Sequence, residues 1–194
     1  MVTAQQIREL REKTGAGVSD IKKALEESKG DIAKATDSIE RKLGLSAGKR
    51  AGRETGAGIV ESYIHSNSRV GVLVELLCET DFVARNPAFK SFAHDVALHI
   101  AAMRPVYLSL DVVPADMWQS EKGRFTEEVA TLKKPKNILD QIIEGKLKSH
   151  FGNMTLLDQS FVKDQDKTVG EVLNETIGKF GENIRIGRFI RFEI

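Results

Sequence analysis

The chain has little cysteine, little proline and almost no net charge. Its 194 residues include one cysteine, Cys78, which excludes an intrachain disulfide and favours a reducing compartment. The 29 basic and 28 acidic residues leave a net charge of +1, so no bulk field attracts nucleic acid or an anionic membrane. We therefore expect neither nucleic acid nor a membrane as a partner.

Long apolar runs are also missing. No stretch approaches the roughly 20 apolar residues that a membrane-spanning helix needs. The N-terminus has no apolar signal region, and Glu9 and Glu12 argue against a transit peptide. These absences predict a cytoplasmic protein, with a bacterial or an organellar origin left open.

Residues 1–45 are predicted to form three short amphipathic helices. The Thr14-Gly15-Ala16-Gly17 run should end the first helix, and Gly30 should end the second. The third should end at Gly44. Such a unit is of marginal size alone. It resembles the ubiquitin-associated domain type, which presents a small apolar surface to partners.

Residues 46–58 are small, basic and glycine-rich, which indicates a flexible or partly helical connector. A phosphate-binding loop is disfavoured, because no apolar strand precedes this segment and the Walker spacing is missing. Residues 59–194 would then form the main core domain.

The core domain is predicted to be α+β. Residues 59–65 and 69–78 read as a hairpin, and the second strand is apolar on both faces, which is typical of a central strand. A helix should begin at Pro87 and end by Arg104. The chain closes on a strand over 184–194 with a bulge at Gly187. We expect an antiparallel sheet packed with helices.

Two more helices are expected on either side of Pro135. The first should begin at Pro114 and turn four apolar side chains inward, namely Met117, Phe125, Val129 and Leu132. Trp118 is expected to pack in the core. The run 133–136 is most simply a solvated break between helices.

An acidic residue and an aromatic residue stand side by side after the central strand. Asp81 and Phe82 lie at the junction between that strand and the helix that begins at Pro87. Connecting segments lie at the surface and often carry function. The ring could fill a pocket in a partner while the carboxylate perturbs its polar groups. Alternatively, Phe82 could pack into the protein's own core.

The residues offer no catalytic constellation. His94 and His99 are five apart, so they share no helix face for a metal. Cys78, His65 and Asp81 could be imagined as a hydrolase triad, but no nucleophile elbow accompanies the cysteine. We expect no catalytic residue, cofactor or metal site, and the residues suggest a binding protein.

Seven stretches, taken in order, resemble the bacterial elongation factor Ts family, whose members exchange the nucleotide of the translational GTPase elongation factor Tu. Any one stretch is weak support, but together they cover essentially the whole chain. They are Thr14-Gly15-Ala16-Gly17, Lys22-Lys23-Ala24-Leu25, Arg69-Val70-Gly71-Val72-Leu73-Val74-Glu75, Thr80-Asp81-Phe82-Val83-Ala84, Gly145-Lys146-Leu147-Lys148, Lys167-Thr168-Val169-Gly170 and Phe189-Ile190-Arg191-Phe192-Glu193.

The resemblance implies a nucleotide exchange factor rather than an enzyme. It would bind the GDP form of elongation factor Tu and promote GDP release during chain elongation. Asp81 and Phe82 would enter the GTPase domain near the bound magnesium and the phosphate-binding loop. The partner-binding residues that it implies are Thr80, Asp81, Phe82, Val83, Ala84, His65, Arg11, Val18 and Ser19.

The other contacts implied by the resemblance lie on both parts of the chain. Arg11, Val18 and Ser19 would dock the N-terminal helices on the GTPase domain, and His65 would contact a more distal domain of the partner. The family often has long apolar residues where Ser19 stands. Short members act as symmetric dimers, and this chain has room for one core, so a homodimer built through the core sheet is expected.

Two other functions fit parts of the sequence. A general interaction protein would bind helical or ubiquitin-like ligands through residues 1–45, and that binding would survive deletion of everything after Gly58. An RNA-associated factor would use Lys49, Arg50 and Arg53 and would bind with strong salt dependence. The net charge near zero argues against the second.

Overall fold

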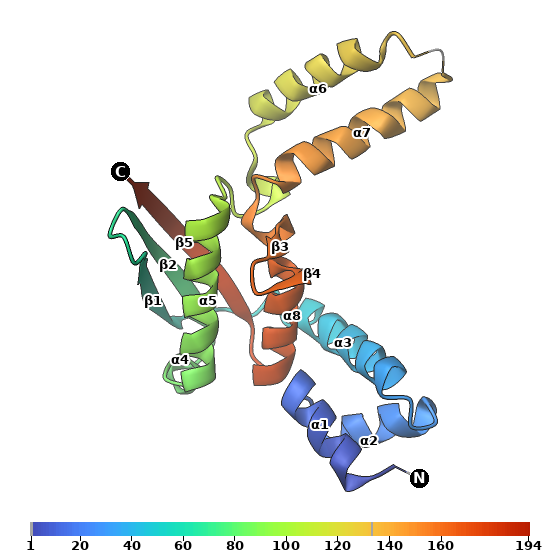
Figure 1. Cartoon of the computed structure of the whole chain (residues 1–194), viewed down its shortest axis with the longest axis vertical. Helices are drawn as coiled ribbons and strands as arrows, with labels where there is room; N and C mark the ends of the chain where they lie inside the picture. The colour runs from blue at the N-terminus through green and yellow to red at the C-terminus, as the bar shows by residue number, and fades with distance from the viewer. Residues whose placement is uncertain (1, 133) are drawn as a thin grey trace.

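The computed structural model describes residues 2–132 and 134–194. In this part of the chain, buried apolar side chains form three clusters. They correspond to an N-terminal module of three helices, a body built on a small sheet, and an arm of two helices that projects from the body (Figure 1). The α+β class is confirmed.

The N-terminal module consists of α1 (Ala4–Thr14), α2 (Val18–Glu27) and α3 (Ile32–Gly48). Gly15 ends α1 with φ 68°, in the left-handed region that glycine tolerates. The expected end of the third helix at Gly44 is wrong. A Cβ on Gly44 would meet nothing within 4 Å, and three residues later Ala47 is buried in the body cluster, so packing favours continuation.

The body contains a three-stranded antiparallel sheet with the order β1-β2-β5. Its strands are β1 (Ala57–Ile64), β2 (Val70–Cys78) and β5 (Ile184–Glu193). The prediction that β2 is central is confirmed. Helices α5 (Pro87–Met103) and α8 (Val169–Phe180) supply the apolar side chains that cover one face (Figure 1).

The predicted bulge in the last strand is confirmed. Gly187 and Arg188 together face one residue of β2, Glu75. The Glu75 carboxylate accepts a hydrogen bond of 3.0 Å from the backbone N–H of Arg188 and others from its guanidinium. These hydrogen bonds hold the pKa of Glu75 below its usual range. A Cβ on Gly187 would lie 2.8 Å from Glu75 Oε2 and 3.0 Å from Glu75 Cβ, so a larger residue there would displace the Glu75 carboxylate from Arg188.

Several short elements were not foreseen. The most important is α4 (Asp81–Ala84), a single helical turn between β2 and α5. The others are η1 (Leu110–Val112), η2 (Leu156–Asp158), β3 (Ser160–Phe161) and β4 (Asp164–Thr168). They lie in segments too short for a clear period of apolar residues.

The arm pairs α6 (Ala115–Val129) with α7 (Lys136–Gly152) around its own cluster. Phe125 and Val129 are buried there as predicted, and Trp118 stacks on Phe151 with 4.9 Å between ring centroids. Met117 and Leu132 are instead 42% and 41% exposed, so their predicted burial is wrong. A helix that packs mainly against one other helix buries only a narrow stripe, and Leu132 lies beyond the end of α6. Of the predicted break at 133–136, Lys133 lies outside the described residues.

Across residues 2–132 and 134–194, every helix is too short or too polar to cross a membrane.

A buried polar network joins the body to the base of the arm. His99 on α5 accepts a hydrogen bond at Nδ1 from the backbone N–H of Val162 (3.2 Å), so the ring proton is on Nε2, 2.9 Å from Gln159 Oε1. The amide of Gln159 donates to the carbonyls of Met103 and Asn153. The neutral imidazole is therefore the form that the fold requires.

This network predicts a loss of stability in acid. Burial lowers the pKa of His99 from its ordinary value of 6.5, so below that pH the unfolded chain binds a proton that the folded chain does not. The free energy of unfolding should fall by up to about 1.4 kcal/mol per pH unit from this group. We expect a shallower decline in His99→Gln, measured by urea unfolding between about pH 7 and about pH 5. The exposed His94→Gln serves as control, and equal slopes in all three proteins would contradict the prediction.

Candidate partner-binding site

Phe82 projects into solvent and does not pack into the protein's own core. Its side chain is 90% exposed, the largest exposure among the large apolar residues described. The next two residues, Val83 and Ala84, are buried in the body cluster. Thr80 caps α4 by accepting a hydrogen bond from the N–H of Val83. This segment, Thr80–Ala84, is called the tip below. It is anchored by its second half and exposes Asp81 and Phe82.

A carboxylate from a distant part of the chain fixes the backbone just before the exposed ring. Glu182 Oε2 accepts hydrogen bonds from the N–H groups of Glu79 (3.1 Å) and Thr80 (3.0 Å). Its Oε1 accepts one from the Thr80 hydroxyl at 2.6 Å. Charge-assisted hydrogen bonds of this kind are stronger than neutral ones. We call this set the carboxylate clamp.

The segment after β2 also accepts a hydrogen bond from the segment that contains Glu182. Glu79 Oε1 accepts a hydrogen bond of 2.6 Å from the N–H of Asn183, the residue after Glu182. The side-chain amide of Asn183 donates in turn to the carbonyls of Ala51 and Arg53. The tip, the end of α8 and the connector after α3 are thus joined by one set of hydrogen bonds.

Sequence reasoning missed Glu182 and Asn183. The only local signal was their place between the glycine that ends α8, Gly181, and the apolar start of β5. A carboxylate and an amide in so short a connection are candidates for capping neighbouring backbone groups. The partner of Glu182, at Thr80, is 102 residues away in sequence and could not be read from that signal.

The predicted contacts in the N-terminal module lie on either side of one turn. Arg11 is in the last turn of α1, and Val18 and Ser19 open α2 after the glycine turn. All three are exposed, with Val18 47% exposed although it is apolar. They form an accessible surface around the 15–17 turn.

His65 lies at the opposite end of the β1–β2 hairpin from the tip. It follows Ile64, which pairs with Gly71, whereas Cys78 pairs with Ala57 at the other end. His65 is exposed, and its Nδ1 is 3.0 Å from the Tyr63 hydroxyl. The structure therefore separates His65 from the tip by the length of the hairpin.

The same separation excludes the imagined triad. Cys78 is buried, and its thiol donates to the carbonyl of Thr80 rather than to a histidine. Burial and the charge of Glu182 raise the pKa of this thiol, which disfavours the nucleophilic thiolate. Within residues 2–132 and 134–194, no group of three or more His, Cys, Asp or Glu side chains could hold a metal ion.

The basic residues of the connector include one that is paired with an acidic side chain. Arg53 Nη1 lies 3.4 Å from Glu79 Oε1, so this cation is paired with the clamp. Lys49 and Arg50 follow the end of α3 in a turn. An arrangement of this kind gives little support to RNA binding.

Known proteins resemble this chain over its full length. The family model of elongation factor TS matches residues 2–194. Elongation factor Ts of Desulfosudis oleivorans is 48% identical over 193 residues, which cover 100% of this chain and 98% of the relative. Elongation factor Ts of Carboxydothermus hydrogenoformans is 46% identical over 194 residues, 100% of this chain and 89% of the relative. The chain belongs to the elongation factor Ts family.

Proposed function

We propose that this chain binds the GDP form of elongation factor Tu and promotes GDP release by inserting Asp81 and Phe82 near the magnesium and phosphate site. Membership of the elongation factor Ts family implies nucleotide exchange on elongation factor Tu in translation elongation. The observation that carries the finer proposal is the 90% exposed ring of Phe82 on a turn whose backbone is clamped. A large aromatic side chain held in solvent by a fixed backbone is suited to fill a partner's pocket.

The mechanism follows from linkage. A GTPase holds its nucleotide through a phosphate-binding loop and a magnesium ion. If the tip binds more tightly to a GTPase conformation in which that site is distorted, binding of the tip lowers the affinity for GDP. By reciprocity, GDP lowers the affinity for the exchange factor by the same factor. The ring supplies the differential contact, and the Asp81 carboxylate would disfavour phosphate nearby.

No covalent bond changes in this scheme. The chain accelerates dissociation of a ligand from its partner, so we propose a role as an exchange factor and not as an enzyme. A translation factor of this kind would act in the cytoplasm.

The remaining contacts would orient the factor on its partner. We propose that Arg11, Val18 and Ser19 dock on the GTPase domain and that His65 reaches a more distal domain. Their exposure and the distance between His65 and the tip support two separate contacts. Residues 1–45 would act as a module of the ubiquitin-associated type, joined through 46–58 to the core domain, 59–194.

We also propose that two copies pair through the open face of the sheet. Leu73 and Ile190 are directly opposite each other on β2 and β5, and each is about half exposed. In the next row, Ile64 and Phe192 flank Gly71, and both are 64% exposed. Contiguous exposed apolar surface of this kind marks an interface. A second copy would cover it isologously, as in most soluble homodimers.

Removal of the ring tests the tip. Phe82→Ala should slow the stimulated release of fluorescent GDP from elongation factor Tu by about 5- to 150-fold, the usual range of site-to-site coupling. Because Phe82 is exposed, the melting temperature should stay unchanged. Val112→Ala, at another exposed apolar residue, is the matched control. Equal release rates for Phe82→Ala and the parent would overturn the role of the ring.

The carboxylate clamp makes a second prediction. Glu182→Gln replaces one of the two acceptor oxygens with an NH₂ group, so the side chain can no longer accept all three hydrogen bonds. The tip should then lose its fixed position, and the maximal release rate should fall about tenfold. Adding Phe82→Ala should produce little further loss, because both changes disable one unit. Glu144→Gln, on the exposed surface of the arm, is the control. Independent losses that multiply in the double variant would argue against a positioning role.

The sheet face predicts the oligomeric state. Sedimentation should give twice the mass of one chain for the parent, and Leu73→Glu should give a monomer because it places a charge in an apolar contact. Met117→Glu, at an exposed residue of the arm, should stay dimeric. A parent that sediments as a monomer at micromolar concentration would contradict the dimer.

A further inference from the structure

The N-terminal module packs against the body mainly through the contact between α3 and α8. Leu43 of α3 lies directly over Gly178 of α8, where an added Cβ would come within 2.6 Å of Leu43 Cδ2 and 2.8 Å of its Cβ. Any side chain at position 178 would therefore push α3 away from α8. A glycine inside a helix costs roughly 1 kcal/mol relative to alanine, so its presence here indicates a need for close approach.

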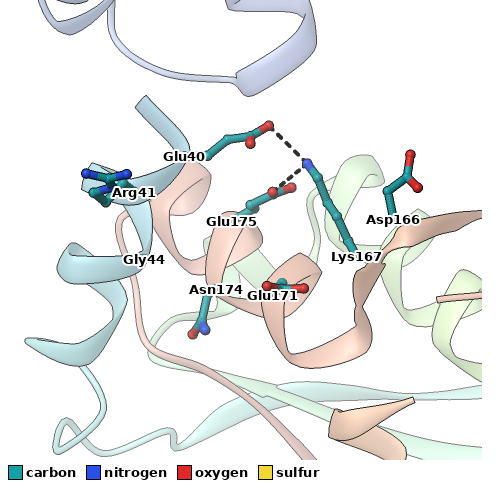
Figure 2. A pocket seen from close by; sticks show the side chains of 8 residues that line it. All are labelled: Glu40, Arg41, Gly44, Asp166, Lys167, Glu171, Asn174 and Glu175. Carbon is teal, nitrogen blue, oxygen red and sulfur yellow. Dashed lines mark hydrogen bonds and ion pairs between the residues drawn. The ribbon is translucent and has the colours of Figure 1, made fainter. Parts of the chain in front are cut away.

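An ion-pair bridge fastens the same two helices (Figure 2). Lys167 Nζ lies 3.0 Å from Glu40 Oε1 on α3 and 2.6 Å from Glu175 Oε1 on α8. Its side chain is 25% exposed. Burial alone would lower the pKa of Lys167, but hydrogen bonds to the two carboxylates outweigh it and the pKa is raised. One cation thus holds together two carboxylates that would otherwise repel each other.

The C-terminal end of α8 also reaches both predicted partner-binding surfaces. The aliphatic chain of Lys179 lies against Gly15 in the glycine turn, with Lys179 Cγ 2.8 Å from the position of an added Cβ. Three residues later, Glu182 forms the carboxylate clamp on Thr80. The turn next to Val18 and the tip are therefore attached to the same short stretch of chain.

We propose that Lys167 and Gly178 are positioning residues that fix the N-terminal module on α8 and thereby set its separation from the tip. This inference rests on the proposed exchange function. Two contacts held on one rigid frame engage a partner with less loss of conformational freedom than two contacts on a loose connection. Lys167 and Gly178 themselves need not touch the partner.

Two substitutions disturb the contact between the N-terminal module and α8 in independent ways. Lys167→Met leaves Glu40 and Glu175 facing each other without a cation, and Gly178→Ala inserts a methyl group under Leu43. In the fluorescent GDP release assay with the full chain, each should raise the half-saturating concentration about tenfold. The maximal rate should stay within about twofold, because the tip and its clamp are intact. Lys167→Arg should restore most of the affinity.

Matched controls make the same two kinds of change, loss of a lysine and addition of a methyl group, away from the N-terminal module. Lys163→Met deletes a lysine whose Nζ makes two hydrogen bonds of 3.0 Å to Asp95 within the body. Gly145→Ala adds a methyl group in α7, where nothing lies within 4 Å. Both should leave the half-saturating concentration unchanged.

A distance measurement tests, without the partner, whether the N-terminal module is held at a fixed distance from the body. Spin labels on Glu27→Cys in α2 and Lys90→Cys in α5 report the spacing between module and body, and buried Cys78 is protected from labelling. Labelled chain is mixed with an excess of unlabelled chain, so that in the proposed dimer only distances within one chain are measured. The parent and Lys167→Arg should then give one narrow distance distribution. Lys167→Met and Gly178→Ala should give a broader or shifted one.

The two measurements separate the possible failures. If the parent stimulates release but Lys167→Met and Gly178→Ala match it in half-saturating concentration and in distance distribution, the positioning role is wrong and the exchange function stands. If the parent does not stimulate release, the proposed function is wrong. An unchanged maximal rate with a raised half-saturating concentration, rescued by Lys167→Arg, would support the inference.

Discussion

The carboxylate clamp is the interaction on which the proposed site depends. Glu182 accepts three hydrogen bonds from two consecutive residues at the end of β2, and Glu79 returns one to Asn183. Without it, the tip would be a short surface turn, and an exposed phenylalanine there would tend to fold back onto apolar surface. With it, the strand end, α8 and β5 share one fixed geometry, and Phe82 stays in solvent.

Phe82 and the open face of the sheet expose apolar groups for two different reasons. Phe82 is a single ring on a rigid support, which suits a specific pocket in a partner. The open face of the sheet is a broad patch with aliphatic and aromatic side chains in adjacent rows, which suits a flat contact with a like surface. In the proposed complex, one chain would present its tip to the GTPase while a second copy covers its sheet.

Local signals in the sequence predicted much of the fold. The helix start at Pro87, the bulge at Gly187 and the central position of β2 each follow from a few neighbouring residues. The tip itself was found from the adjacent Asp81 and Phe82. The wrong predictions depended on tertiary context. The spacing of Met117 predicts an inward side chain, but α6 packs mainly against α7 and leaves Met117 exposed.

Contacts between residues far apart in the sequence were also not predicted. The bond from Thr80 to Glu182 spans 102 residues, and the bridge from Glu40 to Lys167 spans 127. No local pattern encodes such pairs, because each side chain alone resembles an ordinary solvated charge. Gly178 likewise looks unfavourable within its helix until Leu43 is seen above it. The residues that position the site were therefore harder to predict than those that would touch the partner.

In the proposed mechanism, this chain and GDP weaken each other's binding to elongation factor Tu. Titration calorimetry should measure the affinity of the chain for nucleotide-free and for GDP-bound elongation factor Tu at fixed magnesium. The account predicts that GDP weakens binding by about 5- to 150-fold. Equal affinity for the two forms would contradict it, because a factor without differential affinity cannot shift the nucleotide equilibrium.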